Sequence, residues 1–339
     1  MRIIIPMAGI GSRLKPHTLT VPKPLTIIAG KSIVQRLVEE IVKVVGKKVT
    51  DIGFIIGPAA KGFPADTKNQ LKEIAEKLGA KASVFIQEEA LGTAHAIHQA
   101  RSLLDGPSVV AFADTLFKAD FTLNSEDDGV IWVKKVKNPE SFGVVKLKNG
   151  IITDFVEKPK TFVSDLAIIG IYYFKEAEKL RFEIDNLIDN DIRGNGGEYQ
   201  LTDALENLKQ KGGQFVPGTV TDWMDNGNKE VTVETNIKVL QYENKAGKYL
   251  ISKNCKLENV KIIVPCYIGD GAFIKDSTIG PHVSIGCNSV VKDSIIKNSL
   301  IQKNTTINKA NLNKAMIGNH VTYNGDFTSV SLGDYSELK

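Results

Sequence analysis

The stretch Ile268–Gly286 reads IGDGAFIKDSTIGPHVSIG, and an isoleucine returns in it every five or six residues. The same spacing continues on both sides through branched apolar residues: Leu257, Ile262, Ile268, Ile274, Ile279, Ile285, Val291, Ile296, Ile301, Ile307, Leu312 and Ile317. This period fits neither an α-helix nor an alternating strand. It predicts a hexapeptide β-helix of about four coils, in which each of three sides points one aliphatic side chain inward. The alternative is a sandwich of short strands, whose hairpin turns would break the spacing.

Composition limits the class of protein. The chain has 339 residues, of which 42% are hydrophobic and 24% are charged, and its formal net charge is +4. These values are typical of a globular protein with two domains. The charge is too small to argue for nucleic-acid or membrane binding, and no apolar run approaches the roughly 20 residues of a membrane span. Three cysteines without a C-x-x-C pair predict free thiols. We therefore expect a cytoplasmic protein with no nucleic-acid or membrane partner.

The residues before the repeats alternate between apolar runs and amphipathic segments. The apolar runs predict buried parallel strands at Arg2–Pro6, Ile52–Ile56, Ser83–Ile86 and Val109–Ala113. Helical periodicity predicts helices at Ile33–Val44, Leu71–Leu78 and Thr93–Leu104. This alternation indicates an α/β domain at 1–245, followed by the β-helix domain with a C-terminal tail at 250–339. Ligands of such sheets bind beyond the carboxyl ends of the strands.

The loop after the first strand is the most informative one. Residues 7–16 read MAGIGSRLKP, and their glycines allow backbone N–H groups to approach an anion. The loop is not a dinucleotide fingerprint, because Leu14 stands where the third glycine would be, and this excludes an NAD-dependent oxidoreductase. The later segment that ends in Gly30-Lys31-Ser32 is not a P-loop either, because Leu25 occupies the position of the leading glycine. Arg13 and Lys23 are cations that suit a triphosphate and its departing pyrophosphate.

This loop resembles the signature of the sugar-nucleotide pyrophosphorylases, which are nucleotidyltransferases that act on sugar 1-phosphates. The matching residues are Gly9, Gly11, Arg13, Leu14, Pro16, Thr18, Pro22, Lys23 and Pro24. One departure is Ala8, where family members commonly have glycine. The resemblance implies a Rossmann-like, mostly parallel sheet followed by a left-handed β-helix, as in members similar to glucose-1-phosphate thymidylyltransferase. It also implies that Ala8, Gly9 and Gly11 contact the nucleotide.

Later segments resemble further family motifs in the expected order. Residues 87–96 read QEEALGTAHA, which implies nucleotide contacts from Gln87, Gly92 and Thr93. The family pattern makes Asp114, at the end of the fourth predicted strand, a magnesium ligand. A carboxylate in that position lies at a ligand site rather than in the core.

The sugar-binding and second metal positions also come from the resemblance. The implied sugar contacts are Gly143, Glu157, Gly170 and Tyr172. Lys158 is the implied cation on the sugar phosphate, and Asp225 is the second implied Mg²⁺ ligand. Glu198–Asp203 resembles the family segment that opens a helix, although Thr202 and Asp203 alone would more often be capping residues.

The implied reaction condenses a nucleoside triphosphate with a sugar 1-phosphate to give a nucleotide sugar and pyrophosphate. The sugar phosphate is already ionised near neutrality, since the second pKa of a phosphate is about 6, so no general base is needed. What remains is positioning and charge neutralisation. We expect Arg13 and Lys23 to hold the β- and γ-phosphates, and Lys158 to orient the nucleophile. Mg²⁺ on Asp114 and Asp225 is expected to bridge the reacting phosphates.

Several alternatives stay open. dTTP or UTP with glucose 1-phosphate is the favoured pair because both are common in the family, and a guanylyltransferase using mannose 1-phosphate is the alternative. A bifunctional uridylyltransferase and acyltransferase would use His282 and His320 as bases. A non-catalytic sugar-nucleotide sensor would lose phosphate-handling residues, which this chain retains. The β-helix is expected to provide contacts in a homo-oligomer or to pack on the catalytic domain, with Val321–Lys339 capping its open end.

Overall fold

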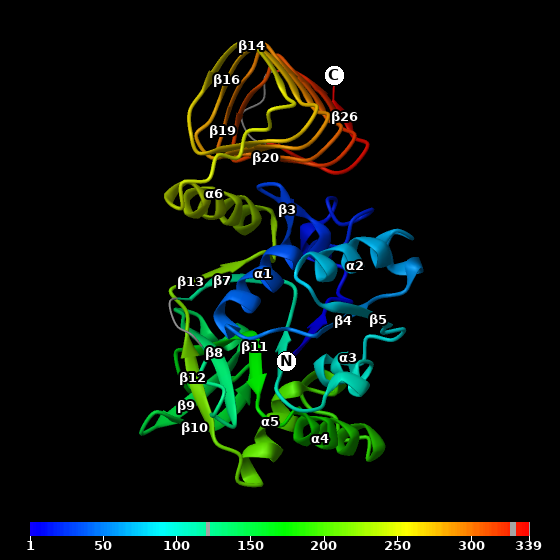
Figure 1. Cartoon of the computed structure of the whole chain (residues 1–339), viewed down its shortest axis with the longest axis vertical. Helices are drawn as coiled ribbons and strands as arrows, with labels where there is room; N and C mark the ends of the chain where they lie inside the picture. The colour runs from blue at the N-terminus through cyan, green and yellow to red at the C-terminus, as the bar shows by residue number, and fades with distance from the viewer. Residues whose placement is uncertain (120–122, 326–329, 339) are drawn as a thin grey trace. The chain divides into compact units, whose positions relative to one another are not determined.

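The computed structural model describes residues 1–119, 123–325 and 330–338 (Figure 1). The chain forms two compact units: Met1–Gly9 with Leu37–Trp223, and Ile10–Arg36 with Met224–Lys339. The segment that carries the signature motif therefore belongs to the same unit as the C-terminal residues, and the units do not follow a single division near residue 250. Within the described ranges, no helix combines the length and apolar character needed to cross a membrane.

The first unit contains the sheet, in the strand order β10-β9-β11-β6-β1-β4-β5. Its parallel part consists of the four strands predicted from the sequence: β1 (Arg2–Pro6), β4 (Asp51–Ile56), β5 (Lys81–Ile86) and β6 (Ser108–Ala111). The three isoleucines of β1 are fully buried, which suits β-branched residues in a central strand. The prediction of burial on both faces is wrong for β5, because β5 is an edge strand and is mostly half-buried.

The other half of the sheet is mainly antiparallel. It contains β8 (Gly129–Lys135), β9 (Gly143–Lys148), β10 (Ile151–Glu157), β11 (Leu166–Phe174) and β12 (Phe215–Thr219). β11 joins the two halves, since it pairs antiparallel with β6 on one side and with β8 and β9 on the other. A separate ribbon pairs β7 (Thr115–Lys118) with β13 (Asp222–Asp225).

Helices also belong to this unit: α1 (Ile33–Val45), α2 (Thr67–Lys77), α3 (Thr93–His98), α4 (Ala177–Asp189) and α5 (Leu201–Gln210). Three of them, α3, α4 and α5, share a core cluster with the sheet. Leu180 and Ile184 of α4 and Leu205 of α5 share a core cluster with Ile4 and Val110 of the sheet. The helix predicted at 93–104 is shorter than expected, because Ala100 leaves helical geometry (φ −102°, ψ 23°) and a 3-10 turn follows.

The second unit contains a β-helix, drawn from yellow to red in Figure 1. A five-stranded sheet in the order β15-β17-β20-β23-β25 and an eight-stranded sheet form its sides. The strands are β14 (Lys256–Ile262), β15 (Cys266–Ile268), β16 (Phe273–Ile279), β17 (Val283–Ile285), β18 (Val290–Lys292), β19 (Ile295–Lys297), β20 (Leu300–Ile301), β21 (Thr306–Asn308), β22 (Asn311–Asn313), β23 (Met316–Ile317), β24 (Thr322–Asn324), β25 (Ser331–Leu332) and β26 (Glu337–Leu338). The same unit holds α6 (Lys229–Lys245) and the short strands β2 (Ile27–Ile28) and β3 (Lys31–Ser32).

The aliphatic residues that recur every five or six positions lie on the coils of a β-helix, as predicted. Leu257, Ile274, Val291, Ile307 and Tyr323 occupy paired positions on successive parallel strands, 16 or 17 residues apart. Leu257, on the first of these strands, is 41% exposed and lies outside the core, contrary to the prediction. The other four form an inner apolar core with their neighbours in the other columns. The parallel pairing excludes the sandwich of hairpins. The described residues of the tail, which was expected to cap the open end, continue the β-helix, because β24, β25 and β26 pair in parallel with earlier coils. Phe327, also expected in that cap, lies outside the described residues.

His282 and His320, the two candidate acyltransferase bases, lie at corners of the β-helix coils. Both His282 (φ 61°) and His320 (φ 56°) have the left-handed backbone also adopted by corner residues such as Asn298 and Asn304. Asn, Asp and His tolerate this conformation better than most residues. The ring nitrogens of His282 contact Gln241 at 3.1 Å and Asn298 at 3.2 Å, so this ring is held within the coil surface.

Candidate functional site

The strand ends of the first unit bring several predicted site residues together. Asp114 lies three residues beyond β6, and the N–H of Ala113 donates to the carbonyl of Pro6 at the end of β1 (3.2 Å). The carboxyl ends of β1 and β6 are therefore held together, with the exposed side chain of Asp114 beyond them. This is the edge at which open α/β sheets bind ligands.

The Tyr172 phenol interacts electrostatically with two carboxylates, Asp114 and Glu157 of the predicted sugar site. Its ring lies on β11 and is only 6% exposed. Burial, followed by the nearby carboxylates of Glu157 and Asp114, raises the pKa of Tyr172 far above its ordinary value. The phenol is therefore neutral and can both donate and accept hydrogen bonds beside two carboxylates.

Glu157 and Gly143 form a close pair across the β9–β10 hairpin. They are direct partners in the strand register, and a Cβ on Gly143 would lie 3.0 Å from Oε2 of Glu157. Thr202 of α5 donates to the same oxygen at 3.4 Å, and the Lys158 ammonium lies 3.8 Å from Oε1. Burial raises the pKa of Glu157, and Lys158 and Thr202 offset only part of this effect. The carboxylate is thus partly desolvated and suited to accept hydroxyl donors from a ligand.

Gly170 marks an irregularity in β11. It has φ +82°, and the register of β11 with β8 shifts between Ile168 and Tyr172. The carbonyl of Gly170 accepts a hydrogen bond from the N–H of Phe112 at 2.9 Å, so the irregular backbone is tied to the end of β6. Bulges of this kind re-aim neighbouring side chains near active sites, and here the affected neighbour is Tyr172.

Gln87 and Gly92 are brought together as predicted for one binding segment. Gln87 follows β5 and is 6% exposed. Its amide nitrogen lies 3.3 Å from the carbonyl oxygen of Gly92 and 3.1 Å from Nδ1 of His95. Burial, with a smaller electrostatic contribution from nearby His98, lowers the pKa of His95, so this ring is neutral near pH 7 and can accept from Gln87. The structure thus fixes the orientation of the Gln87 amide.

Gly92 and Thr93 contact the segment that precedes and starts α5. A Cβ on Gly92, which has φ +117°, would lie 2.5 Å from the carbonyl oxygen of Tyr199. The hydroxyl of Thr93 accepts from the N–H of Leu201 at 2.9 Å and donates to Gln200 at 3.3 Å. Thr93 therefore uses its side chain to hold the start of α5. Sequence reasoning missed the contact with Tyr199, although the Glu198–Asp203 motif placed this residue in a segment of interest.

In the second unit, a glycine loop (residues 10–25) shapes the surroundings of Lys23. Gly11 is left-handed (φ +74°), and a Cβ there would lie 2.8 Å from Cβ of Lys23. The Thr18 hydroxyl donates to the carbonyl of Gly11 at 2.9 Å and closes the loop. Lys23 is 8% exposed, so its stem is packed rather than extended into water. Glycine at position 11 is required both for its backbone conformation and for this close approach.

Arg13 and Asp225 both lie close to Gly227. A Cβ on Gly227 would come within 2.8 Å of Asp225 Oδ2 and 3.5 Å of Arg13 Nη2. The Thr235 hydroxyl of α6 donates to the carbonyl of Asp225 at 3.0 Å, which fixes its backbone. The structure thus places a cation of the glycine loop beside a predicted metal ligand that lies over 200 residues later in the chain. Gly9 and Ala8 belong to the first unit, and a Cβ on Gly9 would meet nothing within 4 Å.

Buried His17, in the glycine loop, makes the unfolding free energy of the protein depend on pH. It is 5% exposed, and burial, with a smaller contribution from Lys229, lowers its pKa from 6.5 to about 4. The unfolded chain therefore binds a proton before the folded chain does, and stability is lost as the pH falls from 6.5 towards 4. Between pH 7 and about pH 5 we expect wild type to lose roughly 2 kcal/mol more unfolding free energy than His17→Gln. Urea unfolding at the two pH values tests this, and equal losses would contradict it.

The donor set fits a hard divalent cation. Asp114 and Asp225 each offer a carboxylate, the ligand type that Mg²⁺ prefers. Among the described residues there is no cluster of three or more His, Cys, Asp or Glu that could hold a metal alone. Mg²⁺ is usually held by one or two carboxylates together with substrate phosphates, so the chemistry of each of these carboxylates suits it.

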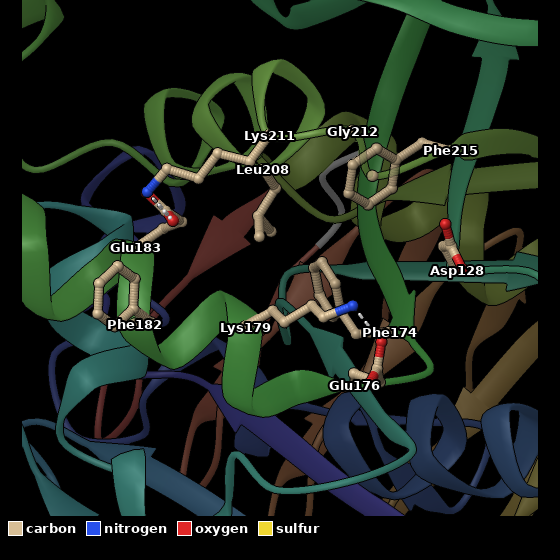
Figure 2. Close-up of a pocket in the computed structure, with 11 residues that line it drawn as sticks. Asp128, Phe174, Glu176, Lys179, Phe182, Glu183, Leu208, Lys211, Gly212 and Phe215 are labelled. Carbon is tan, nitrogen blue, oxygen red and sulfur yellow. Dashed lines mark hydrogen bonds and ion pairs between the residues drawn. The ribbon is translucent and has the colours of Figure 1, made fainter.

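A pocket of about 360 Å³ lies elsewhere in the first unit (Figure 2). Phe174, Leu208 and Phe215 contribute apolar side chains, and two ion pairs line it, Lys179 with Glu176 and Lys211 with Glu183. None of the predicted site residues lines this pocket. The candidate site is therefore identified from its polar side chains and not from this pocket.

The family model described as nucleotidyl transferase matches residues 2–242 of the chain. The chain belongs to this family. Glucose-1-phosphate thymidylyltransferase from Streptomyces antibioticus is 28% identical over 310 residues, which cover 85% of this chain and 83% of that enzyme. The bifunctional protein GlmU from Methanococcus maripaludis (strain S2) is 31% identical over 286 residues, which cover 82% of this chain but only 62% of GlmU. The chain is thus an enzyme of the sugar-1-phosphate nucleotidyltransferase class.

Solved structures agree with this assignment at the level of fold. UDP-glucose pyrophosphorylase complexed with UDP-glucose matches with a TM-score of 0.57 and 23% identity. The match covers 71% of this nucleotidyl transferase and 98% of the pyrophosphorylase. The described β-helix strands begin at Lys256, so the family match at residues 2–242 ends before them.

Proposed function

We propose that this nucleotidyl transferase condenses dTTP or UTP with glucose 1-phosphate to give the nucleotide sugar and pyrophosphate. The observation that carries the proposal is the glycine loop, in which Gly11 is closed around Lys23 and Arg13 lies beside Asp225. Two cations on one constrained loop, with a carboxylate beside Arg13, suit a triphosphate with its metal ion. The S. antibioticus thymidylyltransferase supports the choice of base and sugar.

In the proposed reaction, a phosphate oxygen of the sugar 1-phosphate attacks the α-phosphorus of the triphosphate. The new P–O bond forms as the bond to the β-phosphate bridging oxygen breaks, and pyrophosphate leaves with that electron pair. No proton has to be removed from the nucleophile, so the residues act by positioning and by neutralising charge. Lys23 and Arg13 hold the leaving phosphates, and Lys158 orients the attacking phosphate. Asp114 and Asp225 would hold Mg²⁺, which supplies charge neutralisation at the phosphates.

The first unit supplies the recognition of base and sugar in this proposal. Gln87, fixed by Gly92 and His95, presents an amide that can read a base edge. Glu157, its register partner Gly143 and the phenol of Tyr172 offer polar groups that suit sugar hydroxyls. A guanylyltransferase using mannose 1-phosphate is the competing substrate pair, and no contact in this cluster favours it. We further propose that the enzyme is a homo-oligomer.

An acyltransferase activity of the β-helix has less support. The ring nitrogens of His282 already contact Gln241 and Asn298. His320 stacks on Tyr335 with ring centroids 4.8 Å apart, and its Nε2 lies 3.4 Å from Asn304. A general base needs one ring nitrogen directed at the substrate proton. The contacts of the two rings are those of coil-corner residues.

A substrate matrix tests the proposal. We expect pyrophosphate release with dTTP or UTP and glucose 1-phosphate in the presence of Mg²⁺, and at least roughly tenfold lower kcat/KM with GTP and mannose 1-phosphate. Chelation of Mg²⁺ by EDTA should abolish release in every well. A preference for GTP and mannose 1-phosphate would reject the substrate assignment. No release with any pair would reject the proposed function.

A further inference from the structure

One outer face of the β-helix is largely buried, although Ser331 on its last strand is exposed. Successive strands of its five-stranded sheet align Tyr267, Ser284, Leu300, Met316 and Ser331 in one column. The adjacent column, which runs through Ile285, Ile301 and Ile317, faces the inner core. Because side chains alternate along a strand, the first column points outward. Leu300 and Met316 are nevertheless only 1% and 0% exposed. Outward apolar residues buried to this degree require a covering segment.

The segment Ile10–Arg36 contacts this face at several coils. Nε2 of Gln302, next to β20, donates to the carbonyl of Ile27 at 3.0 Å. A Cβ on Gly30 would lie 2.4 Å from the ring of Tyr267 on β15. Figure 1 shows β3, which follows Gly30, beside the side of the β-helix that carries β20. The segment therefore rests along the sheet and does not touch it at one point only.

The strongest attachment is at the last coil. Nε2 of His17 lies 2.8 Å from the hydroxyl of Ser331, and the Thr20 hydroxyl donates to Asp334. A Cβ on Gly333 would lie 2.7 Å from Cβ of Pro16, so the two backbones approach as closely as glycine permits. Asp334 is itself held in the coil, since it accepts from the N–H of Asn319 at 2.6 Å.

The attached turn is continuous with the phosphate-binding residues. Pro16–Thr20 begins three residues after Arg13, and Thr18 within this turn closes the loop on Gly11. A Cβ on Gly11 would lie 3.5 Å from Thr18 and 2.8 Å from Lys23. One short turn therefore connects the last coil of the β-helix with Gly11, Arg13 and Lys23. A displacement of this turn would move all three.

The eight-stranded sheet provides an internal comparison. Thr306 and Thr322 point outward from its β21 and β24, because their neighbours Ile307 and Tyr323 are in the inner core. Both threonines are exposed. Burial of outward side chains is thus a property of the face that carries the glycine loop, and it is not general to the β-helix.

We propose that the last coil of the β-helix, through Ser331, Gly333 and Asp334, positions the glycine loop for the triphosphate. These are positioning residues, since they act through Pro16, His17 and Thr20 and touch no substrate. The inference rests on the proposed nucleotidyl transfer. It assigns the β-helix a role in the reaction in addition to any role in assembly.

Two substitutions loosen the attachment in different ways. Gly333→Ala adds a methyl group that displaces Pro16, and Thr20→Val removes the donor to Asp334 while keeping the side-chain shape. The matched control is Thr322→Val, which makes the same chemical change on the exposed face of the other sheet. For each variant, kcat and the KM of both substrates are measured, together with hydrogen exchange of the amides of residues 11–25.

We expect Gly333→Ala to raise the KM for the nucleoside triphosphate or lower kcat by about tenfold, because small misplacements of a binding group are costly. Thr20→Val should show a smaller change of the same kind. The KM for the sugar 1-phosphate should stay within about twofold of wild type, and exchange in residues 11–25 should accelerate. Thr322→Val should match wild type in every measurement.

Three outcomes would overturn the inference. These are unchanged kinetics and exchange in both variants, equal losses for the two substrates, and the same effects in Thr322→Val. Failure of the proposed function has a different signature, because wild type would then release no pyrophosphate with any substrate pair. In that case the exchange of residues 11–25 still decides whether the last coil holds the glycine loop.

Discussion

Lys23→Met should lower kcat on the order of 10²- to 10³-fold at saturating substrates, the loss typical of removing one preorganised group that stabilises transition-state charge. Lys23 is 8% exposed and packs against Gly11, so its ammonium is held in place before substrate binds. Methionine retains the long stem and removes the charge, which should largely preserve the packing. Because the charge of the leaving pyrophosphate grows in the transition state, the loss should fall mainly on kcat. Steady-state pyrophosphate release measures it.

Lys15→Met is the matched control for Lys23→Met. Lys15 lies in the same glycine loop and is exposed. Its substitution removes the same charge from the same loop, so any effect of net charge alone should appear in both variants. We expect Lys15→Met to stay within a few-fold of wild type. Near-normal turnover of Lys23→Met at saturating substrate would remove Lys23 from the proposed mechanism.

Gly92→Ala should destabilise the first unit and weaken nucleotide binding together. The residue has φ +117°, and an added Cβ would lie 2.5 Å from the carbonyl oxygen and 2.7 Å from the nitrogen of Tyr199. Backbone atoms cannot rotate away as a flexible side chain would, so the segment before α5 must move. We expect a loss of about 3 kcal/mol of unfolding free energy, from backbone strain and the clash. The KM for the nucleoside triphosphate should rise as well, because Gln87 is bonded to the Gly92 carbonyl.

Gly79→Ala separates the backbone cost from the clash. Gly79 also has a positive φ (+72°), but an added Cβ there would meet nothing within 4 Å. It should cost only about 1 kcal/mol, the penalty of the left-handed conformation. Urea unfolding of both variants gives the difference. Equal losses would show that the contact with Tyr199 carries no cost.

The β-helix could be predicted from the sequence because its interior imposes a short, repeated requirement. Each side of a coil has room for one inward aliphatic residue, so Ile268, Ile274, Ile279 and Ile285 recur at the spacing of the sides. The buried outer face was missed in the sequence reading, although a signal exists. Leu300 and Met316 place a second large apolar residue directly before the inward Ile301 and Ile317. An outward apolar residue at two successive coils indicates a covered face.

The candidate site was only partly predictable. Motif resemblance identified Gln87 and Gly92 as one segment, and the structure brings their side chain and carbonyl together. It did not indicate that the hydroxyl of Thr93 is used to hold the N–H of Leu201. The partner of a polar side chain depends on which distant segment lies beside it, and a motif written as consecutive letters contains no such information.

Three local features follow from the sequence alone. They are the period of the inner aliphatic residues, the glycines at positive φ, and the cations of the glycine loop. These need only the geometry of a few neighbouring residues. The three-dimensional structure decides what the glycine loop rests on, because the His17–Ser331 contact joins residues 314 positions apart. It also decides that Arg13 lies beside Gly227 and Asp225. Such contacts arise from packing of the completed fold, in which burial and close approach select partners that no local pattern specifies.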